Sequence, residues 1–400
     1  MREGWTLTPL GTVTQQAIES IDLQPDVQYR NLGVKWYAAG TFLRDAKPGR
    51  DIKASRLFRV RPGQFVYNRL FATEGSFALI GPEDAEAVVS NEFPVFDVDA
   101  RRLLPEYLYL NFQQESVWQE VNRQCTGTTK SRLRWKEERF RAFTIAMPPV
   151  SEQRRIVDLI GALDDAIAAG EREAECAAGM AVAMRRALPD GDEIELGDLL
   201  RAIESGVSTK PVDGHGDRVS LLSLAAVRPA RFYPTETKDV GAAKLPERAR
   251  LREGDLLITR SNTPDRVGYV CVARGVPSDT FLPDLVWRLV PDEQLVSADY
   301  LEQVLSSTQL RAAITSSASG TSESMRKINK SGFARLRVPL PDRAQQDAYT
   351  RPLRELGTFQ FLQCEAVARL KDLRARVLAV LLSSEHEIPD SYDELMEEAS

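Results

Sequence analysis

The chain has 400 residues, more than one hydrophobic core usually serves, so two domains are predicted. Its composition is 43% hydrophobic and 28% charged, which is typical of a globular protein and excludes a collagen-like or wholly disordered chain. Four scattered cysteines and two histidines supply neither a disulfide framework nor the usual metal or Ser-His-Asp sites.

The net charge of −6 is unevenly distributed. Residues 1–150 hold 20 Lys and Arg against 18 Asp and Glu, and residues 201–340 hold 20 against 16. Residues 191–200 carry four carboxylates and residues 385–400 carry seven, with no Lys or Arg in either segment. Exposed charges are screened beyond about 8 Å at physiological salt. The charge of each segment, rather than the total, therefore determines what it can bind, and the two mildly basic blocks remain compatible with nucleic acid.

No stretch of the sequence fits a membrane span or a signal peptide. The longest uninterrupted apolar run is six residues, 377–382, and no apolar stretch follows the charged first residues. Both segments need longer apolar runs. We therefore expect a soluble cytoplasmic protein with no membrane partner.

An internal repeat runs through the chain with an offset near 193. The run 127–131 falls on 320–324, and Tyr107 falls on Tyr300. Further pairs in the same order are Arg134 and Lys327, Phe140 and Phe333, Pro148 and Pro341, and Gln153 and Gln346. At an offset of 191, residues 61–69 fall on 252–260. The unbroken order of these matches predicts a duplicated architecture.

Each half is predicted to be a mixed block followed by a long helix. The first block is expected to contain a strand at 65–67, its hairpin partner at 76–80, a helix at 105–122 and a last strand at 143–147. The second block repeats them at 256–258, 267–272, 299–315 and 336–340. Strands and helices do not alternate regularly, so we predict antiparallel or mixed sheets and an α+β fold.

The first long helix is predicted over residues 152–188, with Ser151 as its N-cap. Apolar or small residues recur three or four positions apart, which is typical of a coiled-coil seam. The positions expected to pack on a partner helix are Ile156, Ile160, Leu163, Ile167 and Met184. The middle of the seam is Gly and Ala, which would let a partner helix approach closely.

The matching helix covers residues 344–382. Its expected packing positions are Leu353, Leu356, Val367, Leu370 and Val377. Each helix would be about 57 Å long at 1.5 Å per residue, more than one small domain needs, so the two are predicted to form an antiparallel coiled coil. Pro352 and Gly357 are expected to kink or delay the second helix near its start.

The predicted organisation has five parts. They are a globular block at 1–150, a spacer helix at 151–190, a second block at 191–341, a second spacer helix at 342–384, and an acidic tail at 385–400. We expect the tail to be disordered, and the alternative is that it docks back onto a basic face.

Three motifs carry a family resemblance. They are Met147-Pro148-Pro149-Val150-Ser151-Glu152-Gln153-Arg154-Arg155-Ile156, the run Arg-Glu-Gly-Asp-Leu-Leu-Ile-Thr-Arg-Ser-Asn at 252–262, and the Gly-Thr loops at 127–129 and 320–322. Their order and duplication, from about residue 7 to residue 382, resemble the specificity subunit of type I restriction-modification systems. The resemblance implies that the blocks are target recognition domains, each reading half of a split DNA site. It also implies that the paired helices are a spacer and a docking surface for methyltransferase subunits.

Basic clusters at matched places in both halves fit this implication. They lie at 44–61, 130–141, 248–260 and 326–337, and such clusters can neutralise phosphates, although a solvated charged face is the alternative. Base reading needs side-chain donors and acceptors at the ends of rigid elements. The candidate DNA contacts are Asn68, Arg69, Thr128, Thr129, Lys130, Arg132, Arg134, Arg260, Ser261, Asn262, Thr321, Ser322, Arg326 and Lys327. A turn-forming Asn or a carboxylate-paired Arg is the structural alternative for each.

The sequence contains no motif of independent catalysis. It lacks a Gly-Lys-Ser/Thr phosphate loop, a GxGxxG run and the Asn/Asp-Pro-Pro-aromatic motif of an amino-methyltransferase. We therefore expect a non-enzymatic subunit without metal or cofactor, with S-adenosylmethionine and ATP bound only by partner subunits.

The expected partners are double-stranded DNA, two methyltransferase subunits, and restriction subunits that join through the complex. Two alternatives remain open. One is a coiled-coil scaffold that reads no sequence, and the other is a specificity-like subunit of another phage-defence complex.

Overall fold

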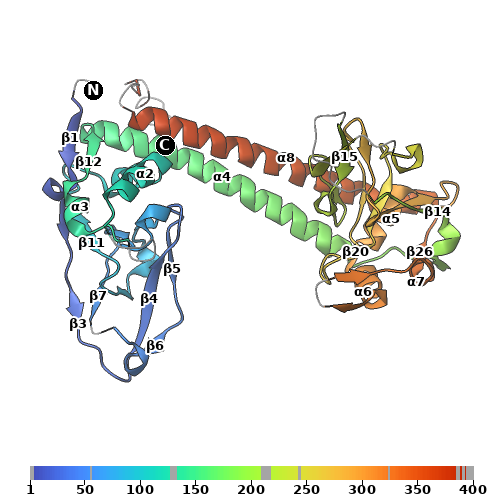
Figure 1. Cartoon of the computed structure of the whole chain (residues 1–400), viewed down its shortest axis with the longest axis horizontal. Helices are drawn as coiled ribbons and strands as arrows, with labels where there is room; N and C mark the ends of the chain where they lie inside the picture. Colours follow the sequence, from blue (N-terminus) through green and yellow to red (C-terminus); the bar gives the residue numbers. More distant parts are fainter. Residues whose placement is uncertain are drawn as a thin grey trace. The chain divides into compact units, whose positions relative to one another are not determined.

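The computed structural model describes residues 4–54, 56–126, 133–208, 218–241, 245–322, 325–383, 388–389 and 392. Contacts divide the chain into two compact units, Met1–Ala168 with Ala368–Ser400, and Ala169–Val367. Each unit joins one mixed block of strands and short helices to one end of each of two long helices (Figure 1). The predicted α+β class with two long helices is confirmed.

The first unit contains two larger sheets and a two-stranded pair. The four-stranded sheet has the order β2 (Thr14–Gln16), β11 (Val95–Val98), β8 (Phe65–Tyr67) and β9 (Phe77–Leu79). The other has the order β3 (Ser20–Ile21), β7 (Leu57–Arg59), β10 (Ala87–Val89), β4 (Gln28–Val34) and β5 (Thr41–Leu43), with β6 (Lys47–Pro48) also on β4. Strand β1 (Thr6–Pro9) pairs with β12 (Thr144–Met147). The antiparallel pairing of β8 with β9 confirms the predicted hairpin.

The second unit repeats this plan. Its four-stranded sheet has the order β14 (Leu200–Ser205), β23 (Val286–Pro291), β19 (Leu256–Thr259) and β21 (Val270–Val272). The other sheets are β18 (Thr237–Gly241) with β15 (Arg218–Leu222) and β22 (Thr280–Phe281), β13 (Asp192–Glu195) with β26 (Arg337–Leu340), β16 (Val227–Arg228) with β17 (Arg231–Phe232), and β20 (Ser261–Asn262) with β25 (Met325–Lys327) and β24 (Ser319–Ser322). The matching strand orders confirm the internal repeat. The parallel pairs β4–β10 and β15–β22 confirm mixed sheets.

The short helices differ from the prediction. The helix expected at 105–122 is two helices, α1 (Pro105–Asn111) and α2 (Glu115–Gln124), and that at 299–315 is α5 (Ala298–Leu305) and α6 (Thr308–Ser317). Local hydrogen bonds favour the breaks, because Trp118 Nε1 donates to the carbonyl of Phe112 at 2.7 Å and Ser307 Oγ accepts from Leu310 N at 3.2 Å. Helices α3 (Glu137–Ala142) and α7 (Lys330–Ala334) precede the last strands and were not predicted.

Short 3-10 helices connect several strands. They are η1 (Leu10–Thr12), η2 (Gly49–Asp51), η3 (Ala72–Glu74), η4 (Pro82–Asp84), η6 (Leu196–Leu199), η7 (Leu224–Ala226) and η8 (Glu247–Ala249). Among them η1 and η6 occupy matching places, directly after β1 and β13. They extend the correspondence between the halves into the connections.

The long helices are α4 (Val150–Met184) and α8 (Arg343–Leu382), green and red in Figure 1. In the first unit Arg374 Nε lies 2.5 Å from Asp164 Oδ1. In the second unit Gln363 Nε2 donates to Glu173 Oε2 at 2.7 Å. In the second unit Gly170 also lies against Val367, so partner numbers fall on α8 as they rise on α4 and the helices pair antiparallel there.

The predicted packing positions lie on the covered faces of these helices. Ile156, Ile160, Ile167, Leu353 and Val367 are buried, and Leu163, Met184, Leu356, Leu370 and Val377 are half-buried. A Cβ atom on Gly170 would lie 2.7 Å from Val367 Cγ2. This contact needs glycine, as the small residues in the middle of α4 predicted.

Three features of the helices and the tail differ from expectation. Helix α4 ends at Met184 rather than near 188, and Leu188 packs against the second block's core. Pro352 does not delay α8, which begins at Arg343 and continues through the proline to Leu382.

The acidic tail was expected to be disordered, but Ile388 is buried in the first block's core and Tyr392 packs against it. Apolar burial holds these two positions. Except for Pro389, the other residues of 385–400 lie outside the described residues.

Two buried glutamines bind the starts of the long helices to their blocks. Gln153 Nε2 donates to the carbonyls of Arg102 and Pro148 at 2.9 Å each, and its Oε1 accepts from Leu104 N at 2.8 Å. Gln346 repeats this with the carbonyls of Leu295 (2.9 Å) and Pro341 (3.1 Å) and with Ser297 N (3.2 Å). The repeated clamp fixes where each helix leaves its block.

Candidate nucleic-acid interface

In both halves a central strand ends beside the segment that follows the Gly-Thr loop. Trp135 N donates to the carbonyl of Arg69, just after β8, at 3.1 Å, and Ile328 N donates to the carbonyl of Arg260, just after β19, at 2.9 Å. The residues that sequence analysis placed at strand ends and after the loops therefore meet. We call the place where Arg69 meets Trp135 the first junction, and the place where Arg260 meets Ile328 the second junction. Backbone hydrogen bonds hold each of them at the end of a buried strand.

The first junction is rich in ion pairs. Asn68 is 9% exposed, and its Oδ1 accepts from Leu70 N at 3.0 Å, which shapes the turn. Arg69 pairs with Glu137 at the start of α3, with both side chains mostly covered. Arg134 Nε lies 2.9 Å from Glu92 Oε2. Thr128, Thr129, Lys130 and Arg132 lie outside the described residues.

The second junction forms the small sheet β20-β25-β24. Ser261 faces Lys327 and Asn262 faces Arg326 across its antiparallel strands. Thr321 and Ser322 lie in β24, the next strand. The structure therefore gathers the second set of predicted residues on one sheet.

The side chains of this sheet hold different partners from those of the first junction. Arg260 lies over the ring of Trp287, 5.9 Å from its centroid, and Asn262 Oδ1 accepts from Thr263 N at 2.9 Å. Ser261 is fully buried, and its hydroxyl has no hydrogen-bond partner within the described residues. In the described part of the chain Arg260, Arg326 and Lys327 form no ion pair, so this junction is the more cationic.

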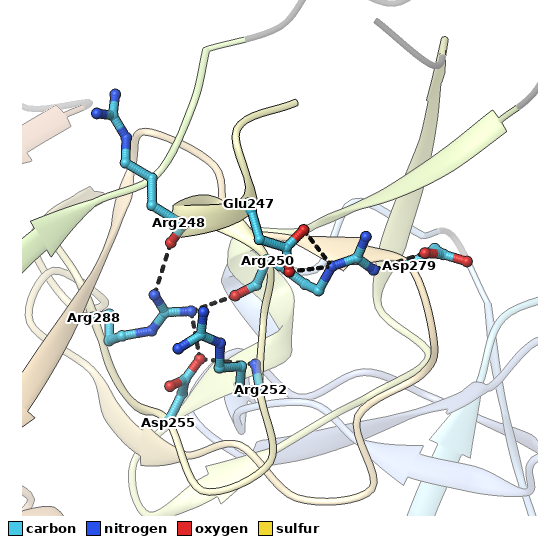
Figure 2. A network of polar contacts seen from close by, with 7 residues as sticks. All are labelled: Glu247, Arg248, Arg250, Arg252, Asp255, Asp279 and Arg288. Carbon is cyan, nitrogen blue, oxygen red and sulfur yellow. Dashed lines mark hydrogen bonds and ion pairs between the residues drawn. The ribbon is translucent and has the colours of Figure 1, made fainter. Parts of the chain in front are cut away.

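A buried arginine, not anticipated from the sequence, organises the basic segment 248–252 (Figure 2). Arg288, 5% exposed on β23, pairs with Asp255 at 2.7 Å and Glu204 at 2.8 Å. It also donates to the carbonyls of Arg248, at 2.9 Å, and Arg250. Burial alone would lower the pKa of Arg288, but hydrogen bonds to the two carboxylates raise it above its usual value. Its single charge amid the apolar run Val286–Pro291 was the available signal.

This network leaves the clustered arginines in different situations. Arg250 Nε lies 2.9 Å from Glu247 Oε1, and its Nη1 lies 2.7 Å from Asp279 Oδ1. The Arg248 guanidinium points away from Arg288 and is exposed (Figure 2). Arg252 anchors through its backbone N–H to Asp255 Oδ2 at 2.8 Å and keeps an exposed side chain. Arg248 and Arg252 are thus better placed for phosphate than Arg250.

Comparison with known families adds a decisive observation. Residues 28–175, from β4 into α4, match the family of the Type I restriction modification DNA specificity domain. Over these residues, called the specificity domain below, the chain is similar to that family. The predicted resemblance to the specificity-subunit family is confirmed, and the specificity domain contains the whole first junction.

Part of this chain also matches a curated specificity subunit. The chain is 26% identical over 166 residues to the Type I restriction enzyme EcoEI specificity subunit of Escherichia coli, which is 40% of this chain. The chain spans only 28% of that relative's length.

Solved structures share the fold over nearly the whole chain. One is a chain described for complex assembly and conformational transition of the type I R-M system, with a TM-score of 0.56, 18% identity, and coverage of 96% of this chain and 98% of that chain. Another is the type I restriction-modification S subunit of M. genitalium, with a TM-score of 0.57, 11% identity, and coverage of 96% and 97%. At these identities the likeness shows the fold alone.

The specificity domain also contains aromatic residues that sequence analysis missed. Trp36, Tyr37 and Phe42 are exposed beside the strand end at Asn68. Tyr37 and Ala38 adopt left-handed φ angles of 59° and 47°, which cost about 1–3 kcal/mol each in non-glycine residues. The adjacent aromatic residues Trp36 and Tyr37 were the available signal in the sequence.

The described residues hold no group of three or more His, Cys, Asp or Glu side chains arranged to bind a metal ion. Among the helices of the described ranges, none is both long and apolar enough to cross a membrane.

Proposed function

We propose that this chain is the DNA-recognition subunit of a type I restriction-modification complex, acting in phage defence, and that its two blocks read the two halves of a split DNA site. One observation carries the proposal. The same backbone hydrogen bond, Trp135 to Arg69 and Ile328 to Arg260, holds a polar strand end at the edge of each block. Two such rigid ends are what reading two half-sites requires.

The two junctions offer suitable chemistry for DNA. Arginine matches guanine and asparagine matches adenine in the major groove, and Arg260 with Asn262 supplies both in the second block. Lys327 and Arg326 lie on the adjacent strand for phosphate contacts. In the first block Arg69 would have to exchange Glu137 for DNA.

The long helices are proposed to dock the methyltransferase subunits, one for each half of the repeat, and restriction subunits through them. Both helices expose apolar side chains although each already has a helical partner. On α4 these are Met180 and Val182, and on α8 they are Phe359, Phe361, Leu362, Leu373 and Val380. Apolar surface of this kind marks protein interaction sites. Catalysis, S-adenosylmethionine and ATP would belong to the partner subunits.

Methylome sequencing of a host with and without this chain tests the proposal. We expect adenine methylation at one split sequence that appears only when the chain and its methyltransferase are both present. The purified chain alone should neither methylate nor cleave DNA. If no sequence-specific methylation depends on the chain, the proposal fails.

Exchanging residues 1–150 for another recognition domain tests the division of labour. Because the two blocks differ in most contact residues, the exchange should change one half-site and leave the other intact. A change in both half-sites, or in neither, would contradict separate reading.

Salt dependence separates DNA reading from a scaffold that reads no sequence. Phosphate contacts make the logarithm of affinity fall linearly with the logarithm of salt concentration. Assembly that ignores both salt and DNA would favour the scaffold.

A further inference from the structure

A pocket in the first block combines aromatic walls with cations. It has a volume near 410 Å³ and is lined by Lys35, Trp36, Tyr37, Phe42, Arg44 and Asn68, among others. This is within the usual size of a small-ligand site. Its wall at Asn68 is the strand end of the first junction, so the pocket opens where the block is proposed to meet DNA.

The rings of the pocket are exposed but held in place. Trp36 is 47% exposed and Tyr37 is 65% exposed. Behind them Trp36 packs on Phe71, with ring centroids 5.4 Å apart, and Tyr37 packs on Trp118 at 6.0 Å. Each ring therefore has a supported side and a free surface.

The backbone of this turn is fixed in a strained conformation. Tyr37 N donates to the carbonyl of Glu74 at 2.9 Å, and Ala38 N donates to the carbonyl of Gly75 at 2.6 Å. Tyr109 OH donates to the carbonyl of Ala38 at 2.6 Å. These bonds hold left-handed φ angles at two non-glycine residues. Strain held in this way is concentrated at ligand-binding sites.

The charges around the pocket have one sign. Lys35 and Arg44 are exposed at its wall, and the lining residues, all of them described, include no Asp or Glu. Arg44 lies 5.6 Å from the centroid of Phe42. Aromatic faces bordered by cations are the surface on which single-stranded nucleic acids stack their bases and place their phosphates.

We propose that this pocket takes an unstacked base of the half-site read by the first block. The base stacks on Trp36, Lys35 and Arg44 contact the flanking phosphates, and Asn68 Nδ2 donates to the base edge. Asn68 can do so because its hydrogen bond to Leu70 uses only Oδ1. The inference rests on the proposed DNA-recognition function and adds a specificity element to it.

The second block does not carry the same rings. Ala230 in the second block has a left-handed φ of 51°, similar to that of Ala38. The two residues before Ala230 are Arg228 and Pro229, whereas those before Ala38 are Trp36 and Tyr37. Base stacking of this kind is therefore expected in the first half-site only.

Tryptophan fluorescence tests the pocket on the full chain. The probes are a short single-stranded oligothymidine and an abasic strand of equal length and charge. Trp5, Trp135 and Trp287 are buried and Trp118 is half-buried, so Trp36 is the indole most open to a base. We expect oligothymidine to quench the emission and the abasic strand to leave it unchanged.

Variants assign the effect to Trp36. Trp36→Phe keeps a stacking ring and should remove the quenching while affinity stays within about twofold. Trp36→Ala should weaken oligothymidine binding about tenfold, which is about 1.4 kcal/mol and within the range of one stacked base. Leu7→Ala, a change at a 63% exposed apolar side chain of the same block, should alter neither quantity.

Three outcomes would overturn the pocket: no binding of oligothymidine, equal quenching by the abasic strand, or unchanged affinity in Trp36→Ala. If methylation in the host still depends on the chain, these results remove the base pocket and leave the proposed function standing. If Trp36→Ala instead abolishes only co-purification of the methyltransferase, the pocket binds protein and the inference is wrong. Absence of chain-dependent methylation is the separate failure of the proposed function.

Discussion

The two blocks have one backbone plan and two different interiors. The sheets β2-β11-β8-β9 and β14-β23-β19-β21 have the same order, yet the first core is aromatic and the second is mainly aliphatic. Matched buried pairs are Phe65 and Leu256, Tyr67 and Ile258, Phe77 and Val270, Phe96 and Leu289, Phe112 and Leu305, and Trp135 and Ile328. Two matched buried pairs keep the same ring, Phe140 with Phe333 and Tyr107 with Tyr300. The strand order that the blocks share therefore depends more on backbone pairing and on the glutamine clamps at Gln153 and Gln346 than on particular core side chains.

The largest chemical difference lies on one strand pair. In the first block Val66 faces Val95, and both belong to a buried apolar cluster. In the second block the matching register places Arg288 opposite Leu257. A buried charge with two carboxylate partners thus replaces a valine. The duplicated frame tolerates such exchanges, so two blocks with one backbone plan can differ in chemistry.

Replacing Arg288 tests this difference with the largest expected effect. Arg288→Val leaves Asp255 and two backbone carbonyls without their donor, and removing one partner of a buried ion pair typically costs about 3–5 kcal/mol. Amide hydrogen exchange should show loss of protection in β19 and β23. Protection in the first block should not change.

The double change Asp255→Gln with Arg288→Val is the matched control. It places in the second block the glutamine and valine that the first block has at Gln64 and Val95. Since Gln64 Oε1 accepts from Arg61 N at 2.7 Å as Asp255 accepts from Arg252 N, the turn can be kept. Most of the lost protection should return. A single Arg288→Val change without effect would show that the network does not hold this segment.

Substitution of Gln153 and Gln346 tests a feature that both blocks share, the attachment of a long helix by a buried glutamine. Gln153→Ala and Gln346→Ala each remove three hydrogen bonds from a buried site, and the unpaired backbone groups should cost about 3 kcal/mol in each case. Thermal unfolding of the two variants should show similar losses. A much smaller loss for one would mean that the halves attach their helices differently.

The repeat made much of this fold predictable. Spacing in the sequence identified the hairpins β8–β9 and β19–β21, the last strands β12 and β26, the two long helices and the strand ends at Asn68 and Arg260, because backbone pairing and apolar period are local properties. It did not predict the other strands, such as those of the sheet β3-β7-β10-β4-β5. The break at Phe112 was not predictable, since it depends on an indole six residues away reaching a carbonyl. Arg288 could not be assigned partners, because Glu204 lies 84 residues away along the chain.

Glu302 is a buried carboxyl of the second block that the first block does not repeat at its matching position. Burial raises the pKa of this carboxyl to about 7, and the hydrogen bond from Val272 N, at 2.6 Å, acts against the rise. In the unfolded chain this carboxyl ionises near pH 4.3. The stability that the protonated Glu302 gives to the folded second block is therefore fully present below that pH and is lost as pH rises through about 7. Tyr109 occupies the matching position of the first block.

Hydrogen exchange at several pH values measures this difference. Protection of the second block should fall by about 3 kcal/mol between about pH 4.5 and pH 8 relative to the first. Glu302→Gln should flatten the profile. A profile unchanged by this substitution would place the titration elsewhere.

The smallest expected effect is a difference between the two junctions in how their charges affect the salt dependence of DNA binding. Lys327 has no ion pair within the described residues, whereas Arg69 is already neutralised by Glu137. With the methyltransferase and duplex DNA present, Lys327→Ala should lower the slope of log affinity against log salt by about 0.9, one phosphate contact. Arg69→Ala should lower it by less than half as much, because Arg69 must first leave its carboxylate.

Glu137→Gln tests whether this ion pair limits the first junction. It removes the carboxylate charge that neutralises Arg69 and keeps a side chain of similar size. If the ion pair is what limits the first junction, this variant should raise the salt slope by about one contact. Arg69→Ala in the same background should then remove as much as Lys327→Ala does in the second block. Fluorescence anisotropy of labelled DNA at several salt concentrations measures all of these slopes. If Arg69→Ala lowers the slope by the same amount with and without Glu137, the carboxylate leaves when DNA binds, and the two junctions meet phosphate in the same way.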